Sequence, residues 1–211
     1  MTDIPPHARI AFVALALALA ATGCPFTVTQ LNRLPPTQPL AAPVSIDGPG
    51  PLRHEASGVE FAERYDGFER VAAVRYDTAG LDVSVGYDDR RPDCLIVATV
   101  YLYPTPRMSF VGASRDVVAA MESDWLAREY ARSKADVQTH HPAMVVIAEE
   151  PASTPSGLAG RSLRFRDGRD VSEMRLFVFA HQWFLKYRIT HPETCTSDAT
   201  ERIDALLRRL G

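Results

Sequence analysis

Histidine and serine side chains are the residues here that could support metal or hydrolytic chemistry, and their spacing favours neither. His140 and His141 are adjacent, so both rings can hardly face one metal ion, unlike two histidines four residues apart on a helix. His181 and His191 stand at the ends of predicted strands, and no carboxylate lies at ligand spacing from them. No Gly-x-Ser-x-Gly sequence places a serine nucleophile between a strand and a helix. We therefore expect no metal and no cofactor, and catalysis only from a site assembled in space around His140, His181 or His191.

Arginines around a predicted hairpin turn at Asp167-Gly168 are the candidate contact for an anionic ligand, a lipid headgroup or an acidic partner. They are Arg161, Arg164, Arg166 and Arg169. Guanidinium groups bind carboxylates and phosphates through paired hydrogen bonds, and Arg164 and Arg166 should share one face of a strand. The alternative is a solvated hairpin whose arginines are balanced by nearby carboxylates.

The first 23 residues have the pattern of an export signal. Ile10 to Ala21 form an unbroken apolar run, preceded by Arg9 and too short to span a bilayer. The run ends in Ala21-Thr22-Gly23-Cys24, which resembles the lipobox of bacterial lipoproteins. In that family the cysteine thiol is diacylated, the peptide is cut before it, and the new amino terminus is acylated. The resemblance implies a lipid anchor on Cys24; an ordinary secretory signal with an incidental cysteine is the alternative.

The lipoprotein resemblance also implies a location. It places the protein on the periplasmic side of a Gram-negative membrane. Pro25 follows the cysteine, where the family typically has an aspartate for retention at the inner membrane, so the inner leaflet of the outer membrane is expected. The net charge of -3 gives no basic excess that would indicate a nucleic-acid partner.

Two further cysteines, Cys94 and Cys195, form an even pair once Cys24 carries lipid. Disulfides persist in exported proteins, and a bond between these two would close a loop of roughly 100 residues, worth at most about 4–5 kcal/mol in the chain-entropy model. The alternative is two buried, unpaired thiols.

Residues 24–51 are rich in proline and lack hydrophobic periodicity. Proline is excluded from helix interiors and central strands and favours extended backbone. We interpret this stretch as a tether between the lipid and a single globular domain of residues 52–211, with an ordered arm on the domain surface as the alternative.

Residues 52–211 alternate between strand and helix patterns. Hairpin signals at Asp66-Gly67 and Asp167-Gly168 predict antiparallel pairing. Strands are also expected over 81–88, 94–103 (apolar on both faces and so covered on both), 143–148 and, split near His181-Gln182, over 171–190. Helical spacing follows Ser114 to about Val137 and again from Thr196 or Ser197. The expected fold class is α+β: a mainly antiparallel sheet covered by a long central helix and a short C-terminal helix.

This order of elements resembles the PsbP-like or Mog-like fold, which includes the bacterial lipoprotein DcrB. The similarity lies in the long central helix, the later hairpins ending in a FLKYRIT-type strand at Phe184 to Thr190, and the short terminal helix. It covers roughly residues 55–211 and implies a non-catalytic scaffold that binds other proteins.

Three functions remain open at this stage. The first is a lipid-anchored envelope module that binds or supports a partner protein at the membrane. The second is a domain that binds a small ligand or lipid, and the third is a hydrolase with a spatially assembled site. A flat apolar patch would favour the first, a large apolar pocket the second, and convergent polar groups with shifted pKa values the third.

Overall fold

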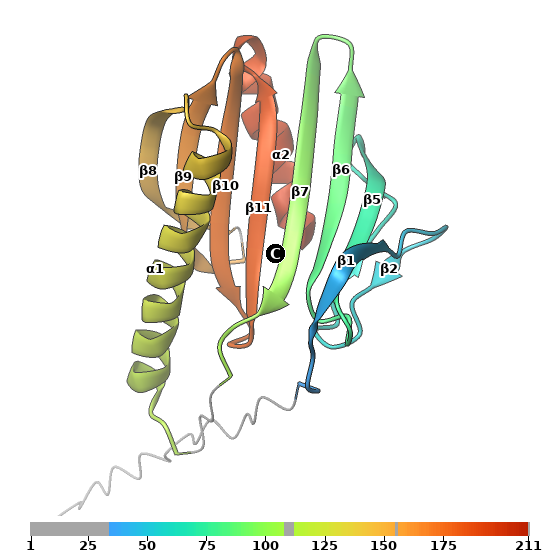
Figure 1. Ribbon diagram of the computed structural model, residues 1–211. Coiled ribbons are helices and arrows are strands. Elements are labelled where there is room, and N and C mark those ends of the chain that lie inside the picture. Colours follow the sequence, from blue (N-terminus) through green and yellow to red (C-terminus); the bar gives the residue numbers. More distant parts are fainter. Residues whose placement is uncertain (1–33, 108–111, 155, 211) are drawn as a thin grey trace, which may run out of the picture.

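The described residues form one antiparallel sheet with a helix on each face (Figure 1). The computed structural model describes residues 34–107, 112–154 and 156–210. The sheet has nine strands in the order β1-β5-β6-β7-β11-β10-β9-β8, and β4 pairs with β5 off this path. The predicted α+β class is confirmed, with every strand pairing antiparallel.

The strands of the main sheet are β1 (Pro39–Ser45), β4 (Arg64–Tyr65), β5 (Phe68–Asp77), β6 (Val83–Arg91), β7 (Cys94–Pro104), β8 (Val145–Ser153), β9 (Ala159–Asp167), β10 (Asp170–Phe179) and β11 (Trp183–Pro192). A small second sheet pairs β2 (Leu52–Arg53) with β3 (Glu60–Phe61). The helices are α1 (Arg115–His140), the short η1 (Glu193–Cys195) and α2 (Thr196–Leu210).

Tight turns connect the strands of the two meanders in this sheet. The first meander is β5-β6-β7 and the second is β8-β9-β10-β11. Asp66 and Gly67 both have positive φ, as the Asp-Gly hairpin signal predicts. The β9–β10 turn centres on Gly168 and Arg169, because Asp167 and Asp170 pair with each other, so it lies one residue later than predicted. The two meanders join where β7 pairs with β11, in the middle of the sheet.

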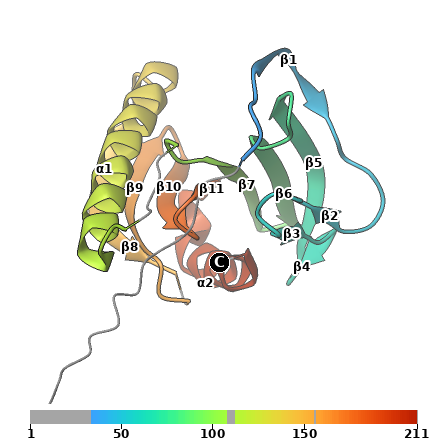
Figure 2. The same ribbon diagram turned by 90° about the horizontal axis from the view of Figure 1, so that it is seen from below.

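Helix α1 covers only one part of its sheet face. The Ser114 side chain accepts a hydrogen bond from the Val117 N–H and caps the helix. The helix continues three residues past the predicted end, to His140. It packs on β9 and β10 (Figure 2), in a core made by Val118, Trp125, Tyr130, Val137, Leu163, Phe165, Met174, Leu176 and Phe184.

Helix α2 lies on the opposite face of the sheet. Its predicted apolar stripe is buried at Ile203, Leu206 and Leu207, against alternate residues of β6, β7 and β11. Arg175 of β10 pairs with Asp204 at 3.1 Å on the same face. The larger of the two cores is therefore on the α2 side.

Strand β7 differs from the expectation of cover on both faces. Its residues alternate between buried and exposed, and Leu95 and Val97 are exposed although both are apolar. The physical reason is the placement of α1, which packs on β9 and β10 instead of on β7. The charged loop predicted over Asp88 to Asp93 is also shorter than expected, because β6 continues to Arg91.

The predicted boundary at Leu52 lies too late in the chain. Residues 39–45 form β1 and pair with β5, with Pro39 opposite Asp77 and Ser45 opposite Val74. β1 ends the order of the sheet, and prolines are tolerated on an edge strand. The second half of the predicted tether is therefore part of the sheet. Cys24 and the apolar run of the export signal lie outside the described residues, and none of the helices within them is long and apolar enough to cross a membrane.

Candidate functional site

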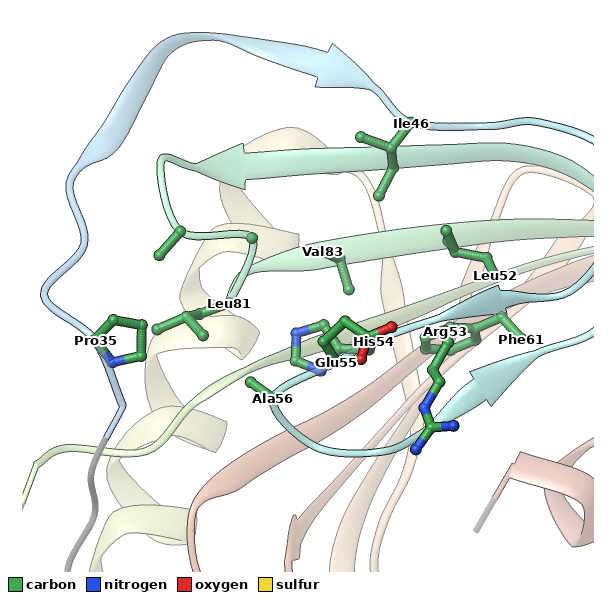
Figure 3. Close-up of a pocket in the computed structure, with 12 residues that line it drawn as sticks. Pro35, Ile46, Leu52, Arg53, His54, Glu55, Ala56, Phe61, Leu81 and Val83 are labelled. Atoms are coloured by element: carbon green, nitrogen blue, oxygen red, sulfur yellow. The ribbon is translucent and has the colours of Figure 1, made fainter.

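An apolar pocket lies between the N-terminal segment and the β5–β6 turn (Figure 3). Its volume is about 440 Å³, within the range of small-molecule sites. Pro35 and Leu81 stand at one end, and Ile46, Leu52 and Phe61 at the other. Arg53, Glu55, Ala56, Ala79, Gly80 and Val83 also line it. Most of the wall is aliphatic or aromatic, and the buried polar side chain among the lining residues is His54.

His54 is fixed in the wall of this pocket by a tight turn and by an aromatic contact. The His54 N–H donates to the Val59 carbonyl at 2.8 Å, and the His54 carbonyl accepts from the Gly58 N–H at 2.8 Å. Gly58 has a φ of 75°, which L-residues with side chains rarely adopt. The imidazole packs edge-on against Trp183, with ring centroids 4.9 Å apart. The ring is therefore held in one place, and only 5% of the residue is exposed.

The imidazole of His54 has one satisfied and one unsatisfied nitrogen. Nδ1 lies 2.7 Å from the Ser57 hydroxyl, whereas Nε2 is buried without a hydrogen-bond partner among the described residues. Burial lowers the pKa of His54, although the backbone of Gly80 and Leu81 and the charge of Asp77 oppose this shift. The ring is therefore neutral at neutral pH, and Nε2 is enclosed by the protein with the backbone of Gly80 and Leu81 beside the ring.

Asp77 fastens the N-terminal segment at the mouth of the pocket. One carboxylate oxygen accepts from the Leu81 N–H at 2.8 Å, and the other accepts from the Thr37 hydroxyl at 2.6 Å. The Asp77 side chain is thus shared by the β5–β6 turn and the segment before β1. Pro35, two residues before Thr37, completes the pocket wall.

A second candidate surface is the half of the sheet on the α1 side that α1 leaves uncovered, which we call the open face. It is defined by Val71, Leu95 and Val97, which are 43%, 46% and 41% exposed. Leu95 and Val97 share a face with Tyr103, which lies four and three alternations further along β7, and Tyr103 donates to Glu129 of α1. Val71 lies beside Gly86, which is on this face because it pairs with Thr99.

The border between the open face and α1 is polar and aromatic. The Lys186 ammonium lies 4.8 Å from the Tyr101 ring centre and 5.3 Å from that of Tyr103, a cation–π arrangement. Burial lowers the pKa of Lys186 and raises that of Tyr101. Asp82 lies at the same border, and burial raises its pKa to about 6. The border therefore combines aromatic rings with groups whose charged forms are disfavoured by burial.

The four candidate arginines do not form one site. Arg161 stacks over the Tyr130 ring on the α1 side, 5.1 Å from its centre. Arg164 and Arg166 share the opposite face, as expected, because Arg164 pairs in register with Glu173. Arg166 is paired with Glu193 at 3.1 Å, and Arg169 occupies the exposed turn. The structure thus favours the alternative of an exposed hairpin with counter-charges.

The candidate histidines are likewise separated. His140 Nδ1 lies 2.8 Å from the Asp136 carbonyl, and His191 is buried with Nδ1 2.9 Å from the Pro192 carbonyl. His181 lies 2.5 Å from the Glu122 carboxylate, in a depression of about 560 Å³ that Ser123 also lines. In the described ranges no group of three or more potential metal ligands is present.

The disulfide between Cys94 and Cys195 is present, with a Cα–Cα distance of 5.8 Å. It joins the first residue of β7 to the last residue of η1, next to the start of α2. Of the described site residues, His54 is the one that sequence reasoning missed. The Glu-Ala-Ser-Gly sequence after His54 indicates a turn, but it does not indicate burial of the ring. That burial depends on Trp183 and Leu81, which approach His54 only in the folded chain.

Comparisons with known proteins add nothing to this geometry. The chain matches no protein-family model, and the searches of curated proteins and of solved structures give no match. The likeness to the PsbP-like fold therefore stays a prediction.

Proposed function

We propose that this chain is a lipid-anchored, non-catalytic envelope protein that binds a partner protein on its open face. The observation that carries the proposal is the exposure of Val71 on β5 and of Leu95 and Val97 on β7, the two strands that flank β6, on one face of the sheet. Exposed apolar clusters bordered by polar residues are typical of protein interaction sites. Tyr101 and Lys186 supply such a border next to α1.

The proposed location is the periplasmic side of the outer membrane, with Cys24 as the lipidated residue. The lipobox-like sequence supports the anchor, and the disulfide supports an oxidising compartment. An anchored domain meets its partner at the membrane surface, which raises the effective concentration of the pair.

The anchor is tested by fractionation of native cells. Wild-type protein is expected in the outer-membrane fraction, and the Cys24→Ser variant should lose that association. A wild type and a variant that fractionate alike would rule out the lipid anchor.

The partner surface is tested with a photo-crosslinking amino acid placed at Val97 in native cells. We expect one dominant crosslinked protein from this position, lost in Cys24→Ser. The matched control is Val117, an exposed valine on α1 away from the open face. The substitution Leu95→Asp should reduce the Val97 crosslink at least several-fold without changing protein abundance. Equal crosslinking from both positions, or none from Val97, would contradict a partner on this face.

A further inference from the structure

We propose that the partner protein places an acidic side chain between Lys186 and Arg188 and covers Leu95 and Val97 with apolar side chains. This inference rests on the proposed function and names the chemistry of the partner for the same surface. Lys186 and Arg188 are alternate residues of β11. Both side chains therefore stand on one face of the sheet, with their Cα atoms about 7 Å apart along the strand.

The two cations border the apolar part of the open face. In the register of β7 and β11, Thr99 lies opposite Arg188. Val97 is the next residue on the same face of β7, so it is a diagonal neighbour of Arg188, about 7–8 Å away. Leu95 follows one alternation later. Positive and apolar side chains therefore form one continuous surface over β7 and β11.

Lys186 and Arg188 are partly buried but have weak partners inside the chain. The Lys186 ammonium lies 3.5 Å from the Ser133 hydroxyl, and Arg188 donates to Nε2 of His141 at 3.4 Å. Both contacts are long for hydrogen bonds. Within residues 34–107, 112–154 and 156–210, neither cation forms an ion pair with a carboxylate. Partly buried charges of this kind are stabilised when a counter-charge is supplied.

The carboxylates that α1 presents on this side already have other partners. Glu129 accepts from the Tyr103 hydroxyl and from Arg132, each at 2.6 Å. Asp136 lies 3.6 Å from the same Arg132. Both carboxylates therefore act on Lys186 only over a longer distance, without a direct bond.

The charge on Lys186 is disfavoured by its surroundings. Burial lowers the pKa of Lys186, and the positive charges of Arg132 and Arg188 act in the same direction. Asp82 forms no ion pair with Lys186 in the described part of the chain, and burial raises the pKa of Asp82 despite that nearby charge. A carboxylate from outside, placed between the two cations, would accept hydrogen bonds from both and offset their repulsion.

The shape of the surroundings favours a protein segment over a membrane surface as the source of this carboxylate. Helix α1 packs on β9 and β10 and stands beside the open face (Figure 2). A helix with its side chains is about 10 Å thick, so a planar bilayer would meet α1 before it reached Lys186. A segment of a partner protein can instead lie on β7 and β11 beside α1, where its apolar side chains cover Leu95 and Val97.

The experiment uses the full chain in native cells, with the photo-crosslinking amino acid at Val97. Mass spectrometry identifies the mass of the adduct and the crosslinked peptide of the partner. We expect an aspartate or glutamate within a few residues of the crosslinked position, next to apolar residues. A partner bound only through apolar contacts would show no such preference.

A pair of matched double variants tests the two cations. Lys186→Met/Arg188→Met keeps long side chains without charge and should reduce the Val97 crosslink about ten-fold or more. Arg208→Met/Arg209→Met removes the same charge from the exposed last turn of α2, on the other face, and should leave the crosslink unchanged. Circular dichroism and protein abundance check each fold. If the first double variant fails to fold, Arg188→Gln replaces it, with a reduction of at least a few-fold expected.

A charge exchange tests the pairing itself. Arg188→Glu should abolish the Val97 crosslink, and lysine in place of the mapped acidic residue of the partner should restore it. Restoration by this lysine alone, and not by alanine at the same place, would establish a direct pair.

Each other outcome overturns a defined part of the inference. A crosslink that survives loss of both cations, or a partner peptide without an acidic residue, overturns the acidic pairing and leaves the partner surface of the proposed function intact. An adduct with the mass of a lipid overturns a protein as the occupant. Absence of any crosslink from Val97 in the wild type overturns the proposed function, and this inference with it.

Discussion

Arg202 of α2 pairs with Asp89 of β6, and both side chains are almost completely buried, with exposures of 6% and 3%. Arg202 also pairs with Asp198 one turn earlier, at 2.9 Å. Arg91 lies 3.6 Å from the same Asp89 carboxylate. The pair therefore links α2 to the middle of the first meander, within the larger core.

Removal of one member of this pair should destabilise the protein strongly. Arg202→Ala leaves the Asp89 carboxylate buried with the exposed Arg91, 3.6 Å away, as its remaining counter-charge, and such changes cost about 3–5 kcal/mol. Chemical denaturation at neutral pH measures the free energy of unfolding. The control is Arg90→Ala, which breaks the exposed pair of Arg90 with Asp88 and should cost under about 1 kcal/mol. Equal losses in the two variants would contradict a special role for the buried pair.

The disulfide should account for a large share of the stability. It spans a sequence separation of 101 residues between Cys94 and Cys195, so the chain-entropy model gives at most about 4–5 kcal/mol. A Cys94→Ala/Cys195→Ala double variant should unfold at a markedly lower denaturant concentration. Addition of reductant should shift wild type toward the variant and leave the variant itself unchanged. A wild type that unfolds identically with and without reductant would show that the bond contributes little.

The β10–β11 turn contains a position that glycine should improve. Ala180 and His181 have φ values of 48° and 61°, and the Gln182 N–H donates to the Phe179 carbonyl at 3.2 Å across them. This left-handed conformation costs a residue with a side chain about 1–2 kcal/mol. Ala180→Gly should therefore raise the melting temperature by a few degrees. The matched control is Ala131→Gly in α1, which should lower it by weakening a helix.

The carboxyl of Asp82 makes stability depend on pH. Its pKa rises from the usual 3.8 to about 6 in the folded protein, chiefly because of burial. Below pH 4 both states are protonated and nothing is lost; between pH 4 and 6 the folded state holds the proton more tightly, so stability falls as pH rises. A shift of about two pKa units corresponds to about 3 kcal/mol, and solvent screening at this partly exposed carboxyl reduces that value. Asp82→Asn removes the titration and should therefore gain about 2 kcal/mol over wild type at pH 7, with almost no gain near pH 3.5. A gain that is the same at both pH values would show that the effect is not ionisation of Asp82.

Local patterns in the sequence predicted most of the helices and strands, but not which strands each helix packs on. The two Asp-Gly hairpin signals and the apolar stripe of α2 depend on neighbours within a few residues. The Asp66-Gly67 turn and the stripe agree with the structure, and the second hairpin forms with its turn one residue later than predicted. The exposure of Leu95 and Val97 depends on where α1 lies, which no local pattern specifies. β1 was missed because prolines exclude central strands, whereas an edge strand accepts them.

The candidate pocket was not predictable for a similar reason. Its walls come from the N-terminal segment, the β2–β3 turn and the β5–β6 turn, and the burial of His54 depends on Trp183, more than a hundred residues away. A histidine in a polar turn sequence gives no sign of such burial. The clustering of arginines in the sequence suggested one binding site that the structure does not contain. Arg161 and Arg164 lie on opposite faces of β9.

The pairing of β1 with β5 has a mechanical consequence for an anchored protein. Any tension between the membrane and the domain enters through the segment before β1, where Thr37 bonds to Asp77. The load next reaches the β1–β5 hydrogen bonds, while the disulfide and α2 belong to later parts of the chain. Because Pro35 and Ile46 flank β1 and also form the pocket wall, a pull strong enough to peel β1 away would open the pocket before it unfolded the sheet.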